Sequence, residues 1–299
     1  MARRNAVIIY NPRSGAHRRK NREAEMAEMV SALGGYGVDA EPWPTTGPGA
    51  ASSLARKAVE QGVDLVVGSG GDGTLNEVLQ GLAGSATPMA IWPSGTANVL
   101  ARELQLSTEP EDVARMIGEG RERRIAVGLA GTRYFFLMAG IGLDASIVRG
   151  VNPALKARLG EPAFWVSGIK HYVAWRPEPF ALEIDGATYE GAYAAVGNAA
   201  SYGGGFSITP RASLDEAVLD VCIFPTRRFA FGYTRDLIAC ATGDPTRFGD
   251  VTYVKAKSLN ATATQADPPW VQVDGELHGP LPMRFESVPD ALTVIVQGT

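Results

Sequence analysis

The pattern of apolar and polar positions changes about 125 residues into the chain. In the first part, short apolar runs alternate with longer stretches in which apolar residues recur at helical spacing. This alternation is typical of βαβ units that build a parallel sheet. We predict strands at residues 6–10, 63–68 and 88–92, and helices at residues 18–33, 50–61, 75–82, 97–104 and 110–118.

The second part is rich in strand-like runs separated by Gly and Pro turns. We predict strands at residues 134–140, 180–184, 192–196, 219–224, 251–256, 271–273 and 292–296. Helical patterns interrupt them at residues 163–175 and 229–241. Short strands with frequent turns indicate an antiparallel β-sandwich. The expected fold is therefore α/β, with a parallel-sheet α/β first domain and a sandwich as the second.

Composition supports a folded protein with two domains. The chain has 299 residues, which exceeds the usual size of one hydrophobic core. Its 45% hydrophobic and 20% charged residues are ordinary for a globular protein. The net charge of -4 argues against nucleic acid as a partner, because duplex binding usually needs a basic footprint.

The start of the chain is locally basic, with no acidic residue before residue 23. The basic residues there are Arg3, Arg4, Arg13, Arg18, Arg19, Lys20 and Arg22. For most of them we favour a solvated helix face. The alternative is attraction to a triphosphate or to an anionic membrane surface. Arg13 is the best candidate for that role because it lies in a glycine-containing loop.

The chain carries the marks of a cytosolic protein. Its two cysteines, Cys222 and Cys240, cannot build a disulfide framework and fit a reducing compartment. The apolar run near the start is too short for the core of a signal peptide. The run at residues 134–148 is interrupted by two glycines and Asp144, so it cannot span a bilayer. We expect a cytoplasmic protein that visits membranes peripherally if its substrate is a lipid.

The strongest chemical signal is GSGGDGTLNE at residues 68–77, directly after an apolar strand-like run. A strand, then glycines, then a helix start aims backbone N–H groups and a helix dipole at phosphate. The glycines permit positive φ and remove Cβ atoms that would hold a phosphate away. Thr74 and Glu77 have the spacing of a capping box. A capped helix alone leaves the carboxylate of Asp72, set among these glycines, unexplained.

The same segment also contains G-x-G-x-x-G, at Gly68, Gly70 and Gly73, which by itself would suggest a dinucleotide-binding fold. That fold needs an acid at the end of the next strand to hold a ribose, and residues 90–94 offer none. No G-x-x-x-x-G-K-[ST] sequence occurs, so the chain is not a P-loop enzyme.

Two further glycine-bearing loops end predicted strands in the same part of the chain. Residues 11–15 (NPRSG) follow the first strand, and residues 93–98 (PSGTAN) follow the strand at 88–92. Loops at the carboxyl ends of parallel strands converge on one crevice. Each loop alone could be a simple turn, but together the three predict a polyphosphate site.

These motifs, in this order, resemble the diacylglycerol kinase catalytic domain family, which includes bacterial soluble lipid kinases and the sphingosine and ceramide kinases. The resemblance runs nearly end to end through NPRSG, GGDGTLNEVLQGL, PSGTANVLAREL, RYFFLMAGIGLDA, GNAASYGGGFSITPRASLDEAVLDVCIF and VDGELHGPLP. GGDGT alone is shared with NAD kinases and phosphofructokinases. Its combination with GTANVLARE and the late DGE is far more specific.

The resemblance implies an ATP-binding α/β domain at residues 1–125, to which residues 286–299 return, and a lipid-binding β-sandwich domain at residues 126–285. It implies that ATP lies between them. It also implies a set of residues that border the nucleotide. They are Asn11, Ser14, Gly15, Thr45, Gly70, Gly71, Asp72, Gly73, Thr74, Asn76 and Thr96, with Thr46 as the alternative to Thr45.

The late VDGE motif at residues 273–276 carries the other implied catalytic residues. Glu276 matches the family's proton acceptor, which would take the proton of a lipid hydroxyl as the phosphoryl group transfers. Asp274 precedes it in the same turn, and Asp72 would act near Mg²⁺ and the γ-phosphate. In some relatives the equivalent of Asp72 is credited as the base, so the division of roles stays open.

The resemblance further implies a second, structural Mg²⁺ at the loop of residues 213–218. Hard cations take oxygen ligands, which a carboxylate and main-chain carbonyls would supply here. The implied ligands are Ser213, Asp215, Glu216 and Val218.

Three departures from the family pattern concern the metals. The usual Asp-Asp-Gly reads Asp-Glu-Ala at residues 215–217. Val99 and Ala126 stand where many relatives carry aspartates around the catalytic metal. Asp72 would then hold Mg²⁺ mainly together with triphosphate oxygens and water, which magnesium accepts.

The sequence therefore predicts an ATP- and Mg²⁺-dependent kinase that phosphorylates a diacylglycerol-like or sphingoid lipid at a membrane surface. Apolar faces at residues 164–175 and 229–233 are candidate membrane contacts. Two alternatives stay open: a catalytically silent lipid-binding or regulatory protein, and an NAD kinase. The identity of the lipid and a homodimer through an edge strand of the sandwich are also left open.

Overall fold

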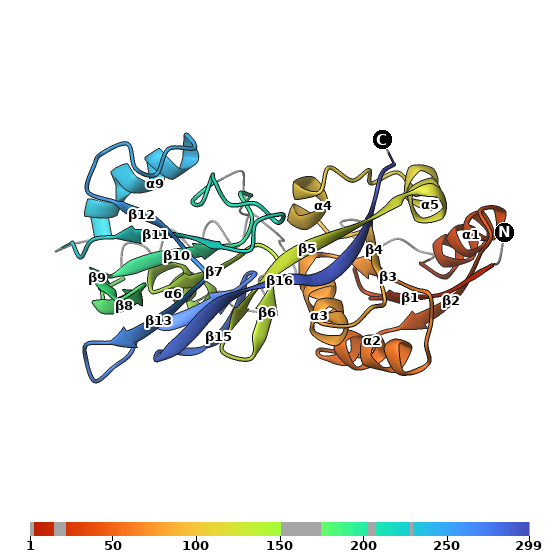
Figure 1. Ribbon diagram of the computed structural model, residues 1–299, viewed down its shortest axis with the longest axis horizontal. Helices are drawn as coiled ribbons and strands as arrows, with labels where there is room; N and C mark the ends of the chain where they lie inside the picture. The colour runs from red at the N-terminus through yellow and green to blue at the C-terminus, as the bar shows by residue number, and fades with distance from the viewer. Residues whose placement is uncertain (1–2, 15–21, 151–174, 202–206, 228–229, 299) are drawn as a thin grey trace. The chain divides into compact units, whose positions relative to one another are not determined.

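The computed structural model of the 299-residue chain describes residues 3–14, 22–150, 175–201, 207–227 and 230–298. The chain forms two compact units, Met1–Ala126 with Asp290–Thr299 (unit 1) and Val127–Pro289 (unit 2), which Figure 1 traces by colour along the chain. Among the described residues, no helix is both long enough and apolar enough to cross a bilayer.

Unit 1 alternates strands and helices along the chain, as predicted. Its elements are β1 (Arg4–Tyr10), α1 (Arg22–Gly35), β2 (Val38–Pro44), α2 (Ala50–Glu60), β3 (Leu65–Gly70), α3 (Asp72–Leu82), β4 (Met89–Pro93), α4 (Val99–Glu103) and α5 (Pro110–Glu119). The strands pair in the order β2-β1-β3-β4, and all of these pairs are parallel. The end of strand β16 (Met283–Val296) then joins β4, also in parallel.

Helices cover both faces of this sheet (Figure 1). Alternate residues of β1 point to opposite faces, because the side-chain period of a strand is two. Ala6, Ile8 and Tyr10 enter a core cluster that contains Met29 of α1 and Ile117 of α5. The helices α2 and α3 pack against each other and against β1 and β3 respectively. The predicted parallel-sheet α/β architecture is confirmed.

Strand β2 was missed by the sequence analysis. Its sequence VDAEPWP contains Pro42 and Pro44, which cannot donate a backbone hydrogen bond. A strand tolerates proline at the edge of a sheet, and β2 is the edge strand, paired only with β1. The pattern of prolines therefore marks an edge strand and not a loop.

The predicted capping box of Thr74 and Glu77 is wrong. Helix α3 already begins at Asp72, with Gly71 as its N-cap and no side-chain cap. Both residues therefore lie inside the helix. Glu77 instead accepts hydrogen bonds from the backbone N–H groups of Gly49 (2.8 Å) and Ala51 (3.1 Å). Its carboxylate thus caps the start of α2, which has no cap within its own sequence.

Other helix ends in unit 1 also differ from the predictions. Helix α1 covers Arg22–Gly35 and so ends two residues after the predicted 18–33, of which residues 18–21 lie outside the described residues. Helix α4 covers only Val99–Glu103 of the predicted 97–104, because Asn98 takes a left-handed conformation with φ 47°. Such a conformation stops a right-handed helix from extending toward its N-terminus.

Unit 2 is built mainly of antiparallel strands. Its elements are β5 (Arg121–Ala130, starting in unit 1), β6 (Arg133–Phe135), β7 (Met138–Ile141), α6 (Leu143–Gly150), β8 (Phe180–Ile184), β9 (Ala187–Gly191), β10 (Tyr193–Gly197), β11 (Leu219–Phe224), the 3₁₀ turn η2 (Ala230–Tyr233), α9 (Thr234–Ala241), β12 (Thr252–Ala256), β13 (Ser258–Ala263), β14 (Trp270–Val273), β15 (Glu276–Pro280) and the first part of β16.

Two sheets form the predicted sandwich. One has the strand order β12-β11-β10-β7-β14-β15, and the other contains β16-β13-β8-β9 with β5 and β6. Their inner faces share one core, in which Ile141 and Val221 of the first sheet pack with Leu182 and Phe285 of the second. The predicted β-sandwich is confirmed, and its two cysteines, Cys222 and Cys240, are free and buried.

The predicted strand at residues 134–140 is wrong as a single element. β6 pairs with β5 in one sheet, whereas β7 pairs with β10 and β14 in the other, so the chain changes sheets between them. Gly142 then ends β7 with φ 88°, and a Cβ atom there would lie 2.4 Å from the carbonyl oxygen of Ala192. This glycine permits the sharp entry into α6, which the sequence analysis missed.

Two predicted helical segments have different outcomes. The segment at 229–241 is a 3₁₀ turn followed by α9, within the described residues. The helix predicted at 163–175 lies outside the described residues, apart from Trp175 at its end.

Replacing Glu77 with Ala tests its role as the cap of α2. We expect the free energy of unfolding to fall by roughly 1–2 kcal/mol, because two backbone N–H groups lose a charged acceptor. Urea denaturation measures this change as a lower midpoint at an unchanged slope. Glu60→Ala, at an exposed position of α2, is the matched control and should leave the midpoint unchanged. Equal midpoints for the two variants would contradict the cap.

Candidate functional site

The carboxyl ends of four parallel strands form one edge of the unit 1 sheet. Backbone hydrogen bonds link the loops that follow them. The N–H of Thr45 donates to Tyr10 O (2.9 Å), that of Asn11 to Ser69 O (3.2 Å), and that of Ser94 to Gly70 O (3.0 Å). The loops after β2, β1, β3 and β4 are therefore neighbours in that order, which confirms the predicted convergence.

Two glycines bring the loops after β3 and β4 into backbone contact. A Cβ atom built on Gly95 would lie 2.4 Å from the Cα atom of Gly71. Any side chain at Gly95 would therefore push the two loops apart. Gly71 is also the N-cap of α3, so the contact places the start of this helix beside the 94–98 loop. Unpaired backbone N–H groups at a helix start attract anions.

Asn98 holds the shape of the loop after β4. Its side-chain oxygen accepts the N–H of Gly95 (2.9 Å), and its side-chain nitrogen donates to the Gly95 carbonyl (3.0 Å). Asparagine tolerates the left-handed conformation found here, with φ 47°. The sequence analysis did not select Asn98, although asparagine after a glycine-bearing turn is a signal for such a closure.

Asp72 ties α3 to α4. One oxygen of its carboxylate accepts the backbone N–H of Leu100 at 3.1 Å. The side chains of Val99 and Ala126, which replace acids in the family pattern, are buried and apolar. Asp72 is thus the acidic side chain that the motif loops bring to this edge, and a lone carboxylate fits a magnesium ion that keeps phosphate and water ligands.

Most of the predicted nucleotide-binding residues lie at this edge. They are Asn11, Ser14, Thr45, Gly70, Gly71, Asp72, Gly73, Thr74 and Thr96. Gly15 lies outside the described residues. Asn76 lies on α3 with its side chain buried, and it accepts a hydrogen bond from the Gln80 side chain at 3.1 Å. The structure therefore gives the Asn76 side chain a contact within α3.

Arg22 is an exception among the basic residues at the start of the chain, for most of which a solvated helix face was favoured. Its side chain is only 12% exposed and donates hydrogen bonds to the hydroxyls of Ser69 and Ser94 at the ends of β3 and β4. Arg13, the candidate chosen from the sequence, is exposed, and its backbone N–H donates to the side-chain oxygen of Asn11. Glu25, one helical turn after Arg22, was the available signal, because such a pair anchors one edge of a guanidinium.

In unit 2, the late motif forms a tight turn between β14 and β15. Asp274 and Gly275 both have positive φ, of 46° and 81°. Two successive residues with positive φ are typical of a type I′ hairpin turn. The turn places Glu276 at the first position of β15.

The Asp274 carboxylate anchors this turn to the sheet-changing segment between β6 and β7. It accepts the backbone N–H groups of Phe136 (2.8 Å), Leu137 (3.0 Å) and Met138 (3.1 Å). These N–H groups lie where the chain leaves one ladder for another, so they need such an acceptor. Asp274 therefore has a structural task that its position in the motif did not reveal.

A buried polar chain supports the same turn from inside. The Gln272 amide donates to the Asp144 carboxylate (2.7 Å), and its oxygen accepts the N–H of Gly275 (2.7 Å). Gln272 and Asp144 are both buried. Fully paired buried groups rigidify their surroundings, so the turn is held from two sides.

Glu276 is the exposed acid of the motif. Its side chain is 44% exposed and forms an ion pair with Arg133, which is 23% exposed. Arg133 follows the β5–β6 turn, so the pair fixes the orientation of the carboxylate relative to that hairpin. A carboxylate that is oriented and still open to solvent can accept a proton from a substrate hydroxyl.

Two family models cover nearly the whole chain. Residues 5–130 match the model described as the diacylglycerol kinase catalytic domain. Residues 138–296 match the model described as the YegS C-terminal NAD kinase beta sandwich-like domain. The chain belongs to the diacylglycerol kinase catalytic domain family.

Known relatives in this diacylglycerol kinase family are similar over almost their full length. A diacylglycerol kinase of Staphylococcus saprophyticus is 29% identical over 288 residues, which is 95% of this chain and 92% of that protein. One of Bacillus subtilis is 29% identical over 285 residues, or 94% and 92% of the two chains. A solved diacylglycerol kinase structure from Bacillus anthracis is 25% identical, with a TM-score of 0.79 over 98% of this chain and 97% of that chain.

The 213–218 loop of this family member carries an ammonium where the resemblance implied a structural cation. Lys255 of β12 lies 2.5 Å from the Glu216 carboxylate and 3.9 Å from that of Asp220. The Ser213 carbonyl accepts the N–H of Glu216 at 3.0 Å. No cluster of three or more His, Cys, Asp or Glu side chains suited to a metal occurs in the described parts of the chain. Of the implied ligands, Glu216 is therefore paired with Lys255 in this structure.

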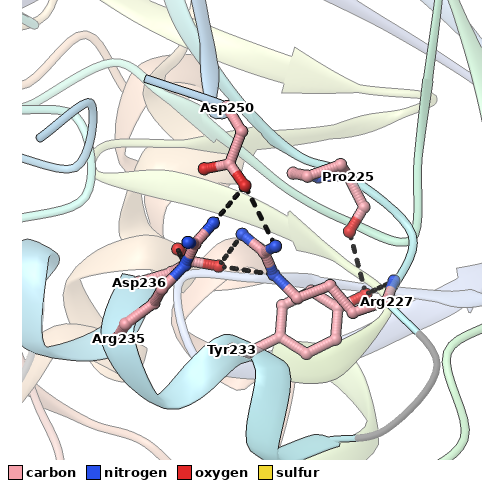
Figure 2. A network of polar contacts seen from close by, with 6 residues as sticks. All are labelled: Pro225, Arg227, Tyr233, Arg235, Asp236 and Asp250. Carbon is pink, nitrogen blue, oxygen red and sulfur yellow. Dashed lines mark hydrogen bonds and ion pairs between the residues drawn. The ribbon is translucent and has the colours of Figure 1, made fainter. Parts of the chain in front are cut away.

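A second polar network, shown in Figure 2, fastens α9 to the end of β11. Arg227 donates to Asp236 (2.7 Å) and to Asp250 (3.0 Å). Tyr233 is 1% exposed, and its hydroxyl donates to Pro225 O at 3.1 Å. Tyr233, at the end of the 229–233 segment proposed as a membrane contact, is therefore anchored inside unit 2.

Residues 164–174 and Phe229 of the predicted membrane-contact surface lie outside the described residues. The large apolar side chains that the described part of unit 2 exposes are Ile238 (56%) and Phe248 (43%), on α9 and in the loop after it.

The contacts of Lys255 predict that the 213–218 loop is independent of divalent cations. We expect thermal melting of the wild-type protein to be the same in magnesium chloride and in EDTA. Lys255→Met should lose roughly 1 kcal/mol and should then gain stability from Mg²⁺, because Glu216 and Asp220 lose their cation. Lys257→Met, at an exposed neighbouring position, is the control. Stabilisation of the wild type by Mg²⁺ would contradict the assignment.

His278, on β15, predicts a pH dependence of stability. Burial, together with the charge of Arg133, lowers its pKa below the ordinary 6.5. Its Nε2 lies 3.1 Å from Ala130 O, a partner that requires the proton on Nε2. The His278 imidazole becomes charged at a higher pH in the unfolded chain than in the folded protein. The free energy of unfolding therefore falls as the pH drops below the pKa that His278 has in the unfolded chain.

His278→Gln should remove this part of the acid sensitivity. Chemical denaturation between about pH 7.5 and pH 5 should show a smaller loss of stability in the variant than in the wild type. The difference between the two curves isolates His278 from the carboxylates that titrate in the same range. Parallel curves would contradict the lowered pKa.

Proposed function

We propose that this protein is an ATP-dependent lipid kinase that transfers the γ-phosphoryl group of ATP to a hydroxyl of a diacylglycerol-like lipid. The observation that carries the proposal is the meeting of four polar loops and the start of α3 at one sheet edge, in a chain of the diacylglycerol kinase family. Such an edge is where open α/β sheets bind their ligands.

The nucleotide is assigned to unit 1. The N–H groups at the start of α3 and the glycines on either side of the Gly71–Gly95 contact suit phosphate oxygens. The remaining neighbours of the triphosphate are assigned to the loops after β1, β2 and β4. They are Asn11, Ser14, Gly15, Thr45 and Thr96.

Magnesium is assigned to Asp72. When bound, the ion neutralises charge on the β- and γ-phosphates. Asp72 would hold it with the carboxylate oxygen that does not bond Leu100. Because Val99 and Ala126 offer no further carboxylate, we expect phosphate oxygens and water to complete the coordination.

The lipid and the proton transfer are assigned to unit 2. Glu276 accepts the proton of the lipid hydroxyl as that oxygen attacks the γ-phosphorus and the bond to ADP breaks. Arg133 orients the Glu276 carboxylate. Asp274 acts as a positioning residue, because its carboxylate holds the turn through backbone N–H groups.

Two other functions are compatible with the family. A catalytically silent lipid-binding or regulatory protein is suggested by the loss of acids at Val99 and Ala126. An NAD kinase is suggested by the shared GGDGT and by the description of the sandwich model. The intact Asp72 and Glu276 favour the lipid kinase over the silent protein, and relatives named diacylglycerol kinase over 95% of the chain favour a lipid over NAD.

Labelled ATP separates these functions. The wild-type protein is mixed with γ-labelled ATP, Mg²⁺ and vesicles that contain diacylglycerol, monoacylglycerol, sphingosine or ceramide, and NAD is offered in a parallel reaction. We expect label in lipid and protein in the vesicle pellet. Label in NAD would establish the NAD kinase, and label in no acceptor would establish the silent protein.

Glu276→Gln and Asp72→Asn test the assigned roles in the same assay. Loss of the base should lower kcat by roughly 10²- to 10⁴-fold while leaving the KM for ATP nearly unchanged. Asp72→Asn should lower kcat and raise the Mg²⁺ concentration needed for half-maximal rate. Glu190→Gln, at an exposed position on β9, is the control. A wild-type rate in Glu276→Gln would move the base role to Asp72.

A further inference from the structure

We infer that Arg22 is a positioning residue of the nucleotide site: through the hydroxyls of Ser94 and Ser14 it locks the loops after β4 and β1 together and brings a fixed cation to the phosphate loops. The inference rests on the proposed function, because it assigns Arg22 a part in binding ATP. It adds a residue that lies outside the glycine motifs.

Arg22 crosses from the start of α1 to the ends of two strands. Its Nη2 atom donates to Ser69 Oγ (2.8 Å) and to Ser94 Oγ (2.9 Å), side chains 47 and 72 positions away in the sequence. Its Nη1 atom donates to Glu25 at 2.8 Å. The guanidinium lies over the ring of Trp92, 5.1 Å from its centroid. Four contacts of this kind leave the side chain one orientation.

The hydroxyl protons of Ser14 and Ser94 have one consistent arrangement. Ser14 Oγ donates its only proton to Asn11 O at 2.9 Å. In the 3.4 Å contact between the hydroxyls of Ser14 and Ser94, Ser94 must therefore be the donor. The hydrogen bonds run in one direction, from Arg22 to Ser94, from Ser94 to Ser14, and from Ser14 to the Asn11 carbonyl.

This relay fixes the distance between two predicted phosphate loops. Ser14 lies in the loop after β1, and Ser94 begins the loop after β4 that carries Gly95. A hydroxyl that accepts from a cation is a stronger donor in turn. Without Arg22, Ser69 and Ser94 would each lose a charged hydrogen-bond donor. The two loops would then be joined only by the long contact between the hydroxyls of Ser14 and Ser94.

The charge of Arg22 also acts on this edge. Its Glu25 partner neutralises the Nη1 side, while the Nη2 side faces the strand ends. The side chain is 12% exposed, so water screens it weakly. The basic side chain of β1 is used elsewhere: Arg4 donates to the carbonyls of Ile117 and Gly118, at the amino end of the sheet.

Calorimetric titration with Mg·ATP tests the assignment on the full-length protein. Arg22→Met should weaken ATP binding roughly 10- to 100-fold. Arg22→Lys should recover part of this loss because it keeps the positive charge, but only part because an ammonium lacks the planar set of N–H donors of a guanidinium. In kinase assays the KM for ATP should rise by a similar factor, while the KM for lipid stays unchanged. A purely structural role would not confine the effect to ATP.

Ser94→Ala provides a second route and a coupling measurement. Alone it should weaken ATP binding less than Arg22→Met, and in the double variant the two losses should combine to less than their product, because both break the same relay. If Arg22→Met does not fold, the affinity of Ser94→Ala for Mg·ATP, compared with that of the wild type, still tests the relay. Arg115→Met is the matched control, since it removes an arginine of a surface ion pair in the same unit.

The outcomes separate the inference from the function on which it rests. If the wild type does not bind Mg·ATP, the proposed function fails and the role of Arg22 fails with it. If the wild type binds ATP and either Arg22→Met or Ser94→Ala binds it equally well, the relay is overturned while the kinase assignment stands. Equal rises in the KM for ATP and for lipid would also overturn it.

Discussion

The unit 1 site depends on one close approach, the contact between the backbones of Gly71 and Gly95. A side chain at Gly95 would meet the Cα atom of Gly71 at 2.4 Å, so the loops after β3 and β4 can touch only with glycine at position 95. This contact sets the start of α3 beside the 94–98 loop. Backbone N–H groups with no helical partner are then collected at one edge of the sheet, where an anion can bind them.

Some carboxylates in the motifs hold the fold, and others are the ones to which we assign chemical roles. Glu77 caps α2, and Asp274 accepts three N–H groups where the chain changes sheets. Both satisfy backbone donors that would otherwise be costly to bury. Asp72 gives one oxygen to α4, and Glu276 stays exposed beside Arg133. A motif thus contains residues that stabilise its own backbone, so the presence of an acid in a motif does not by itself make that acid catalytic.

Much of the fold could be read from periodicity, because each helix and central strand of unit 1 carries its own apolar pattern. Three predictions that failed can each be traced to a particular segment of the chain. The prolines of β2 concealed an edge strand, and the run at 134–148 was continuous in sequence although the chain changes sheets within it. The capping box at Thr74 failed because the N-cap of α3 is Gly71, three residues earlier. At β2 and at residues 134–148 a strand partner distant in sequence decided the structure, whereas at α3 the glycine before the helix did.

The sequence by itself determined the fold class, the family and three of the four loops that meet at the sheet edge, since glycine spacing and the succession of strands and helices along the chain are properties of the sequence. Only the tertiary structure decided the use of each polar side chain. The hydrogen bonds of Arg22 to Ser69 and Ser94 appear only in the folded protein. The same holds for the ion pair of Glu216, an implied metal ligand, with Lys255. The reason is physical: hydrogen-bond and ion-pair partners are chosen by distance in space, which residue spacing does not encode.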